Sequence, residues 1–399
     1  MSKNTGPLSG IRVLEMGQLI AGPFSAKTLG DLGAEVIKIE PPEKGDPLRQ
    51  WRLIHEGTSV WWEAQSRNKQ SVAIDLRQPE GQQLAYRLAI EADILIENFR
   101  PGTLESWGMS YDNLSRDNPG LIMLRISGYG QTGPYRDLPG FGAIGEAMGG
   151  LRHLTGQPGE VPVRVGLSIG DTLAALQGSI GVLAALFERE KNGGQGQVID
   201  MALYEAVFNC TESLLPEFSA FGAIRGPAGS ALPGITPSNA YPCLNGYVLI
   251  AGNGDSIYQR LMRAIGREDL AADPELASNK GRSLHAERID QAISAWTQRH
   301  PIEEVLQTLA HASVPAGKIY TIKDISDDPH YRAREMIETV TTANGLTVDV
   351  PGVIPKLSRT PGSIRHRAPL LGEHTQVVLQ QLGLDEHTID ALKDKGIIQ

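Results

Sequence analysis

The stretch that decides the fold is Ile11–Glu40, IRVLEMGQLIAGPFSAKTLGDLGAEVIKIE. The apolar run Ile11–Met16 is predicted to be a buried strand, and Glu35–Glu40 is predicted to be a second strand. The helical pattern between them ends at Leu32, and Gly33 is the residue expected just after the helix. A strand, a helix and a strand within about 30 residues form a βαβ unit, which implies a parallel sheet with a right-handed crossover.

The same alternation continues outward from this unit. Four further runs are predicted to be strands, at Ser71–Asp75, Asp93–Glu97, Leu121–Ile126 and Gln197–Met201. Helical patterns follow or separate them, at Pro79–Glu91, Thr172–Lys191 and Ala202–Leu215. The helix at 172–191 is apolar almost all round in its first half, so we expect it to be buried. Strands that alternate with helices predict an α/β layer structure for about the first 200 residues.

The composition changes beyond this region. The segment Phe221–Pro242 is rich in Gly, Pro and Ser, which indicates a linker or a binding loop. A strand is predicted at Gly246–Ala251, and helices follow through Ala312. An edge strand is predicted at Leu346–Val350, and the chain ends in two helices, one at Thr375–Leu382 and another that runs up to Gly396.

Composition excludes several classes of protein. The 399 residues carry 37 Lys and Arg against 46 Asp and Glu, a net charge of -9 without a basic run, so we expect neither nucleic acid nor an anionic membrane as partner. No continuous apolar stretch approaches about 18 residues, so we expect no membrane span. Two cysteines, Cys210 and Cys243, exclude a disulfide framework and fit a reduced, cytoplasmic protein. The histidines show no paired metal-binding spacing, and we expect no metal.

A glycine motif, Gly128-Tyr129-Gly130-Gln131-Thr132-Gly133, follows a predicted strand and matches the dinucleotide fingerprint GxGxxG. That fingerprint needs a helix that opens at its third glycine and holds a pyrophosphate at its N-terminus. Pro134 and Pro139 follow instead, so the chain is expected to continue as a loop. The motif is therefore interpreted as a Gly-rich turn beside a site.

Asp171 lies in GLSIGDT (166–172), at the start of the long apolar helix. One interpretation is a plain N-cap aspartate. The other is a carboxylate that is held beside flexible glycines, stays ionised near a helix N-terminus and attacks an electrophilic carbonyl. The residues alone leave both interpretations open.

Two charged segments, Arg67-Asn68-Lys69 and Glu97–Gly102 (ENFRPG), lie at the edges of predicted strands. They are either solvated surface charges or, taken together, a basic pocket for phosphates at the carboxyl ends of parallel strands, where open α/β sheets bind ligands.

Taken in order, seven stretches resemble the class III CoA-transferases, the family that includes formyl-CoA transferase and carnitine CoA-transferase. Each is weak alone, but the ordered set is specific and covers nearly the whole chain. They are LEMGQLIAGP (14–23), LGDLGAEVIKIE (29–40), RNKQSVAID (67–75), ENFRPG (97–102), SGYGQTGP (127–134), GQVIDM (196–201) and APLLGEHT (368–375).

The resemblance implies a fold and an assembly. A Rossmann-like large α/β domain is expected from both chain ends, residues 1–215 and 326–399. A Gly/Pro-rich linker is expected at 216–245 and a smaller inserted α/β domain at 246–325. Two such subunits are expected to form an interlocked homodimer.

The resemblance also implies site residues. Asp171 matches the nucleophilic aspartate of the family. Four stretches match segments that contact coenzyme A in the family: Ile20 and Ala21; Ile74, Asp75, Leu76 and Arg77; Asn98, Phe99 and Arg100; and Pro139, Gly140, Phe141 and Gly142. Coenzyme A is then expected as part of the substrate, with no tightly bound cofactor.

The sequence departs from the formyl-CoA transferase pattern at three places. Pro41 and Ser106 stand where that pattern has arginines, and Arg100 is expected to replace one of these phosphate contacts. Leu232–Thr236 (LPGIT) stands where that pattern has a run of glycines over the active site. These departures argue against formate or oxalate as the acid.

The expected function is therefore transfer of CoA from an acyl-CoA, with succinyl-CoA favoured as the donor, to a free carboxylic acid through aspartyl anhydride and aspartyl-CoA intermediates. An α-methylacyl-CoA racemase is the first alternative, but it needs a histidine in the segment matching Gly140-Phe141-Gly142, and Phe141 cannot carry a proton. A CoA-binding homologue without catalytic activity is the second alternative.

Overall fold

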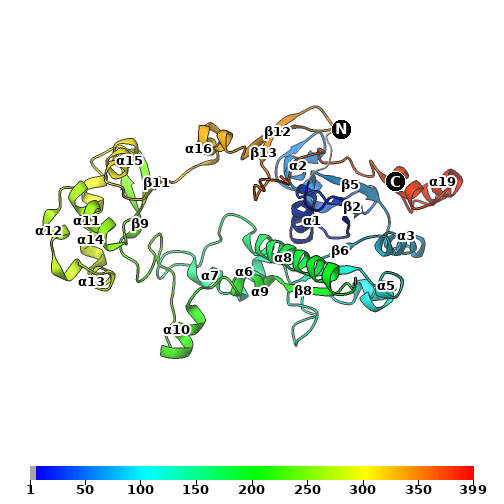
Figure 1. Cartoon of the computed structure of the whole chain (residues 1–399), viewed down its shortest axis with the longest axis horizontal. Helices are drawn as coiled ribbons and strands as arrows, with labels where there is room; N and C mark the ends of the chain where they lie inside the picture. The colour runs from blue at the N-terminus through cyan, green and yellow to red at the C-terminus, as the bar shows by residue number, and fades with distance from the viewer. Residues whose placement is uncertain (1–5) are drawn as a thin grey trace. The chain divides into compact units, whose positions relative to one another are not determined.

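The βαβ unit at 11–40 forms the middle of a six-stranded sheet in the computed structural model, which describes residues 6–399. Every neighbouring pair of strands in this sheet is parallel, as the sequence predicts. Figure 1 shows the sheet and its covering helices. In spatial order the strands are β5 (Lys69–Ala73), β2 (Glu35–Glu40), β1 (Arg12–Glu15), β6 (Ile94–Glu97), β7 (Ile122–Ser127) and β8 (Val198–Ala202).

Alternate residues of each strand face two separate apolar cores, so helices cover both faces of the sheet. Val13, Val36 and Ile94 pack on one face, against α1 (Ala21–Asp31), α8 (Ile169–Lys191) and α9 (Leu203–Phe208). Leu14 and Ile37 pack on the other. That second face is covered by α3 (Pro79–Ile90), α5 (Tyr111–Asp117), α18 (Thr375–Gln381) and α19 (Glu386–Asp394).

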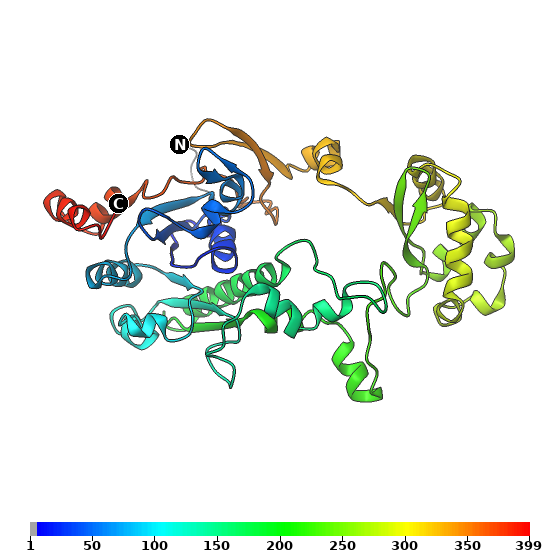
Figure 2. The same ribbon diagram turned by 180° about the vertical axis from the view of Figure 1, so that it is seen from behind.

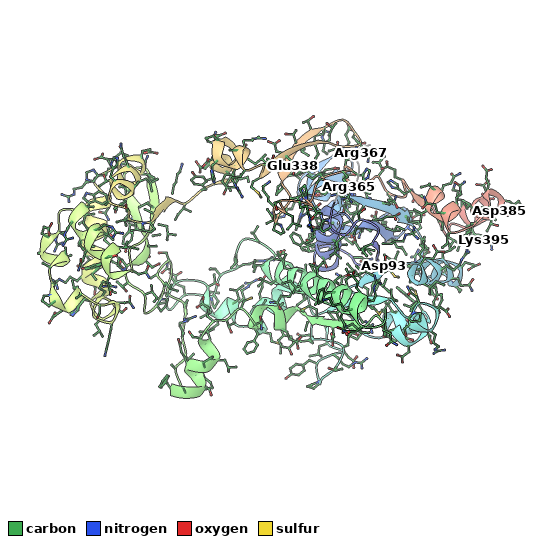
Figure 3. All side chains as sticks on the ribbon, in the orientation of Figure 1. Asp93, Glu338, Arg365, Arg367, Asp385 and Lys395 are labelled. Atoms are coloured by element: carbon green, nitrogen blue, oxygen red, sulfur yellow. The ribbon has the colours of Figure 1, made fainter. Side chains whose placement is uncertain are left out.

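Residues from distant parts of the chain meet at this sheet. Asp93, labelled in Figure 3, accepts a hydrogen bond from the backbone N–H of Arg12 at 2.9 Å and pairs with Arg189 near the end of α8 at 2.9 Å. The C-terminal residues return to the sheet, where Ile398 forms a β-bridge with Ile74. Both ends of the chain therefore contribute to one domain.

The chain divides into two compact units. The first contains residues 1–152, 164–224 and 330–399, and the second contains 153–163 and 225–329. The domain boundaries expected from the sequence, at 215 and 326, differ from the observed ones at 224 and 330. The sequence analysis also placed the short segment 153–163 in the large domain, whereas it belongs to the second unit. The second unit has an antiparallel sheet of β9 (Ser238–Cys243), β10 (Gly246–Ala251) and β11 (Ala316–Lys318).

The second unit has its own apolar core, built from the sheet and the helices beside it. Figure 2 shows the ribbon of these elements from behind. The helical segments of this unit are α11 (Asp255–Ala264), α12 (Glu268–Ala271), η2 (Pro274–Leu276), α13 (Asn279–Leu284), α14 (Ala286–Thr297), α15 (Ile302–His311) and α16 (Ile322–Asp327).

Short elements complete the fold. The remaining helices are η1 (Pro47–Gln50), α2 (Val60–Ser66), α4 (Thr103–Ser106), α6 (Gly142–Met148), α7 (Leu151–Leu154), α10 (Leu214–Phe221) and α17 (Pro329–Ala333). The remaining strands form two hairpins, β3 (Ile54–His55) with β4 (Thr58–Ser59) and β12 (Ile337–Thr341) with β13 (Thr347–Pro351).

Two expectations about secondary structure were wrong. The helix predicted at Ala202–Leu215 is interrupted between α9 and α10, where Glu212 adopts a left-handed φ of 52° and Thr211 Oγ1 donates to the carbonyl of Phe208. Hydroxyl side chains compete in this way with helical backbone bonds. The Gly/Pro-rich segment at 221–242 is not all loop, because β9 begins at Ser238.

The long helix α8 is only partly buried, contrary to the sequence-based expectation. It packs on α1 through a buried 2.9 Å contact between the hydroxyls of Ser25 and Ser179. Its other side exposes a row of apolar residues, namely Leu176, Ile180, Leu183 and Phe187. By length and composition this helix could cross a membrane, with a mean hydropathy of 1.4, but helices that pack in the core of a protein pass the same test.

Candidate active site

The site begins at the place where the order of the strands reverses. From β1 the chain proceeds through β2 to β5, then returns to the other side of β1 as β6. In such sheets, ligands bind outside the carboxyl ends of the strands that flank this switch point. Asn98, just after β6, joins the two ends here: its Oδ1 accepts from the N–H of Gln18 at 2.8 Å, and its Nδ2 donates to the carbonyl of Gln18 at 2.9 Å.

A cavity of about 190 Å³ opens at this switch point. It brings together three of the four predicted CoA-contact stretches and Asp171. Its wall includes Ile20 and Ala21, Asn98 to Arg100, and Pro139 to Phe141, together with Gln18, Gly128, Arg136 and Leu203. Gly142, the last residue of the stretch 139–142, is buried at the start of α6 and is not part of this wall.

The loop before α1 is fixed by buried charges. Leu19 has a φ of 64°, which is costly for a residue with a branched side chain. Its N–H donates to both carboxylate oxygens of Asp46, at 3.1 and 3.2 Å. Asp46 in turn pairs with the fully buried Lys38, which also binds Glu15 and the carbonyl of Gly17. This network gives the 17–20 loop one shape before any substrate binds.

Asp171 lies in the first turn of α8, and it is not the N-cap residue. Ser168 has that position, and its side chain caps no backbone N–H. The carboxylate of Asp171 rests on the backbone of Gly142, where a Cβ atom would lie 1.9 Å from Oδ2. Position 142 therefore requires glycine, because any side chain would occupy the space of this carboxylate.

The electrostatic surroundings raise the pKa of Asp171 to about 6. Burial is the larger cause, because it disfavours the charged carboxylate, and the negative charge of Glu146 adds to it. Arg164 acts in the opposite direction. At neutral pH the carboxylate remains ionised, as the nucleophile interpretation requires. Since burial also removes hydration from the anion, this aspartate differs from an ordinary surface carboxylate.

One predicted CoA stretch lies apart from the cavity. Ile74 to Arg77 follow β5, at the outer edge of the sheet. Ile74 and Asp75 are buried, whereas Arg77 is exposed and pairs with Asp75 at 2.8 Å. These residues share the carboxyl edge of the sheet with the cavity but do not line it.

The charged segment 67–69 fits neither of its two interpretations, a solvated surface charge or part of a phosphate pocket. Lys69 begins β5, so this segment lies at the amino edge of the sheet rather than the carboxyl edge. Both cations are buried and paired, Arg67 with Asp31 at 2.7 Å and Lys69 with Glu15 at 2.8 Å. Arg100 and Arg136, in contrast, line the cavity itself.

Some features of this site were missed by the sequence analysis. Gln18 lies within the motif LEMGQLIAGP, yet its backbone contact with Asn98 needs the folded sheet to be recognised. Glu146 is fully buried on α6 and approaches the N–H of Gly170 at 3.4 Å. The N–H of Gly170 therefore faces this carboxylate and not the cavity.

The positions of the other predicted features can be stated briefly. The Gly128–Gly133 motif forms a loop after β7 and no helix opens there, in accord with the prediction; Gly128 lies against Gly140 in the cavity wall. Pro41 follows β2, and the hydroxyl of Ser106 donates to the carbonyl of Thr103 at 2.7 Å. Within residues 6–399, no three His, Cys, Asp or Glu side chains group in a way that would hold a metal ion.

The chain is similar over nearly its full length to known proteins. Residues 8–375 match the sequence profile of CoA-transferase family III. The chain is 47% identical over 395 residues to succinyl-CoA–D-citramalate CoA-transferase of Chloroflexus aurantiacus, with 98% of each chain covered. It is 34% identical over 397 residues to succinate–glutarate CoA-transferase of Agrobacterium fabrum, covering 97% of this chain and 98% of the relative.

A solved structure is similar as well. The crystal structure of a CAIB/BAIF family protein from Brucella suis superposes with a TM-score of 0.84 at 34% identity, covering 95% of this chain and all of the other. The match of profile, sequence and fold over nearly the full length shows that the chain belongs to CoA-transferase family III and is a CoA-transferase.

Proposed function

We propose that the protein transfers CoA from succinyl-CoA to a free dicarboxylic or hydroxydicarboxylic acid, with Asp171 as the nucleophile. The observation that carries the proposal is the presence of Asp171 in the wall of the switch-point cavity that Ile20, Asn98 and Pro139 also line. The relatives named above support the choice of acids, since their names combine a succinyl group with citramalate or glutarate.

The reaction proceeds through three covalent intermediates on Asp171, two anhydrides and one thioester. Its carboxylate attacks the thioester carbonyl, the carbon–sulfur bond breaks, and CoA leaves as the thiolate from an acyl-aspartyl anhydride. The thiolate then attacks the aspartyl carbonyl, which releases succinate and leaves an aspartyl-CoA thioester. The acceptor carboxylate attacks this thioester to form a second anhydride, and the returning thiolate takes up the acyl group and restores Asp171. Covalent catalysis divides one difficult transfer into easier steps in this way.

The side chain of Asp171 needs no partner base for this chemistry. A carboxylate with a pKa of about 6 is largely ionised at pH 7, and it is more basic than an exposed aspartate. The close contact with the backbone of Gly142 limits the motion of the Asp171 carboxylate, which supports attack from a fixed position. CoA enters as part of the substrate, and its contacts are assigned to the segments at 20–21, 74–77, 98–100 and 139–142.

We also propose that the enzyme is a homodimer with interlocked subunits. The apolar row on α8, from Leu176 to Phe187, supports a partner surface. Helix α10 also buries none of its residues and exposes Leu215, Phe218 and Phe221. Contiguous exposed apolar surface commonly marks a site of protein association. The two cysteines form no disulfide, which supports a cytoplasmic location.

An acceptor screen tests the proposed function. Purified enzyme is incubated with succinyl-CoA and one acid at a time, with acetyl-CoA as the alternative donor, and the acyl-CoA products are identified by mass spectrometry. We expect new acyl-CoA and free succinate in equal amounts for dicarboxylic acceptors. Formation of no acyl-CoA from any acid, by an enzyme that still binds CoA, would identify a non-catalytic homologue instead.

A further inference from the structure

A second carboxylate, that of Glu146, lies beside Asp171 without any exposure to solvent. Its Oε1 approaches the N–H of Gly170 at 3.4 Å, next to Asp171 in the chain. Its Oε2 lies 3.3 Å from Nε of Arg152 and 3.9 Å from Nε of Arg164. A buried anion is unfavourable unless cations compensate it, and these two arginines supply that compensation.

Arg152 and Arg164 differ in their contact with Glu146 and in their exposure to solvent. Arg152 is within hydrogen-bond distance of Glu146, and about a quarter of its side chain is exposed. Arg164 is 47% exposed, lies beyond hydrogen-bond distance of Glu146, and makes a long 3.3 Å contact with the hydroxyl of Ser168. A guanidinium carries five N–H donors in a planar fork that matches a carboxylate. Arg164 therefore keeps donors available close to Asp171.

We propose that Arg164, held beside Asp171 by Glu146, binds the carboxylate of the dicarboxylic substrate that does not react. The inference rests on the proposed function and names the group that selects its substrate class. Succinate carries its second carboxylate at the other end of a four-carbon chain. Arg164 lies near the reacting end of such a chain, because its Nε is 3.9 Å from Oε2 of Glu146, and Oε1 of Glu146 is 3.4 Å from the backbone nitrogen of Gly170, the residue before Asp171.

The balance of charge supports this assignment. In the free site, Glu146 and Asp171 offset Arg152 and Arg164. When Asp171 forms an anhydride it loses its negative charge, so the four side chains retain one net positive charge. The remote carboxylate of a succinyl group restores neutrality, whereas a butyryl group of the same length leaves the positive charge unpaired. The site therefore favours the dicarboxylic acyl group in the covalent intermediate as well as in the bound substrate.

A purely structural role for these residues is the competing explanation. Residues 152 and 164 flank the segment 153–163, which belongs to the second unit. The Glu146 cluster would then serve only to fix the chain at these two points. Such a role predicts equal losses for every acyl group, whereas binding of a remote carboxylate predicts a loss for dicarboxylic acyl groups alone.

Isotope exchange separates the two roles without knowledge of the natural acceptor. The enzyme is incubated with succinyl-CoA and carbon-13-labelled succinate, or with butyryl-CoA and labelled butyrate, and label entering the acyl-CoA is measured by mass spectrometry. The test variant is Arg164→Met. The matched control is Arg332→Met, because Arg332 has a similar exposed fraction, 46%, but lies on α17 and pairs with Asp349 rather than with Glu146.

For Arg164→Met we expect kcat/KM for succinyl exchange to fall about 10- to 100-fold, the range for a lost hydrogen bond to a charged group. Both exchanges are measured at about pH 8, because loss of the Arg164 charge also raises the pKa of Asp171 and the carboxylate must stay ionised in every variant. Under these conditions butyryl exchange should stay within about threefold of wild type, since butyrate has no second carboxylate for Arg164 to bind. Arg332→Met should change neither exchange. Arg164→Lys, which keeps the charge and loses the fork, should recover part of the succinyl rate and serves as the test if the methionine variant fails to fold.

Equal losses of succinyl and butyryl exchange in a folded Arg164 variant, or no loss of either, would overturn the inference and leave the proposed function intact. Wild-type enzyme that exchanges butyrate as readily as succinate would also overturn it. Wild-type enzyme that exchanges neither acid would refute the proposed function before any variant is made.

Discussion

The substitution Gly142→Ala tests whether the carboxylate of Asp171 reacts from the position observed in the structure. A Cβ atom at 142 would lie 1.9 Å from Oδ2, 2.6 Å from Cγ and 3.1 Å from Oδ1 of Asp171. Ordinary contact begins at 3.4 Å, so the nearest oxygen must move by about 1.5 Å. The backbone at 142 is helical, so alanine introduces no strain of its own.

A displacement of this size should reduce kcat about 100-fold, because misplacement of a reacting group by about 1 Å costs that much. The affinity for CoA should change less than threefold, because the added methyl group would face Asp171 and would leave the backbone of residue 142 in place. The assay measures steady-state transfer and, separately, equilibrium binding of CoA. Gly22→Ala is the matched control, because Gly22 also lies in the first turn of a helix and its Cβ would meet its neighbours at 3.4 Å or more.

We expect Gly22→Ala to keep at least a third of the wild-type rate. If Gly142→Ala also kept a third or more, the carboxylate in the observed position would not be the group that attacks the thioester. A parallel loss of CoA binding would likewise refute the reasoning, because it would show that the cavity as a whole had collapsed.

Three further predictions concern pH, assembly and the racemase alternative. Because Asp171 must be ionised and its pKa in the free enzyme is raised to about 6, kcat/KM for succinyl-CoA should be constant above that value and fall about tenfold per pH unit below it. Glu146→Gln removes one cause of the shift and should move this limb to lower pH, and an unmoved limb would refute the assignment. Interlocked subunits cannot separate without unfolding, so dimer loss and unfolding should coincide, and a folded monomer in sedimentation across a dilution series would contradict this. In D2O, a 2-methylacyl-CoA should gain no deuterium at its α-carbon, because Phe141, 70% exposed in the cavity wall, cannot carry a proton; rapid incorporation would favour the racemase.

Local sequence patterns predicted most of the sheet. The run EVIKIE became β2 with the predicted bounds, and GYVLIA became β10. Both are short segments rich in Val and Ile, so the information lies within about ten residues of chain. The αβ alternation then restricted the topology, because parallel strands require right-handed crossovers.

Features that depend on distant partners could not be predicted in this way. Arg67 and Lys69 are buried because Asp31 and Glu15 meet them from other elements, and nothing local distinguishes them from surface cations. The exposed face of α8 follows from which side α1 covers, whereas composition reports only that the helix is apolar.

The site shows the same division. Asp171 was identified by resemblance, since its local pattern also fits an N-cap. Its raised pKa depends on Glu146, which lies 25 positions earlier and faces it only after α6 and α8 pack. The tight contact of Gly142 with Asp171 likewise needs the folded chain, although Gly142 had been assigned to a CoA-contact stretch.

The central claim, that Asp171 carries the acyl group and then CoA, is tested most directly by trapping. Enzyme is mixed with succinyl-CoA without acceptor, quenched with hydroxylamine and digested, and the peptide containing residue 171 is analysed by mass spectrometry. The account predicts an aspartyl hydroxamate at Asp171 in wild type, none in Asp171→Ala, and a transfer rate in that variant far below a tenth of wild type while CoA still binds. A hydroxamate at another residue, or transfer by Asp171→Ala within tenfold of wild type, would contradict it.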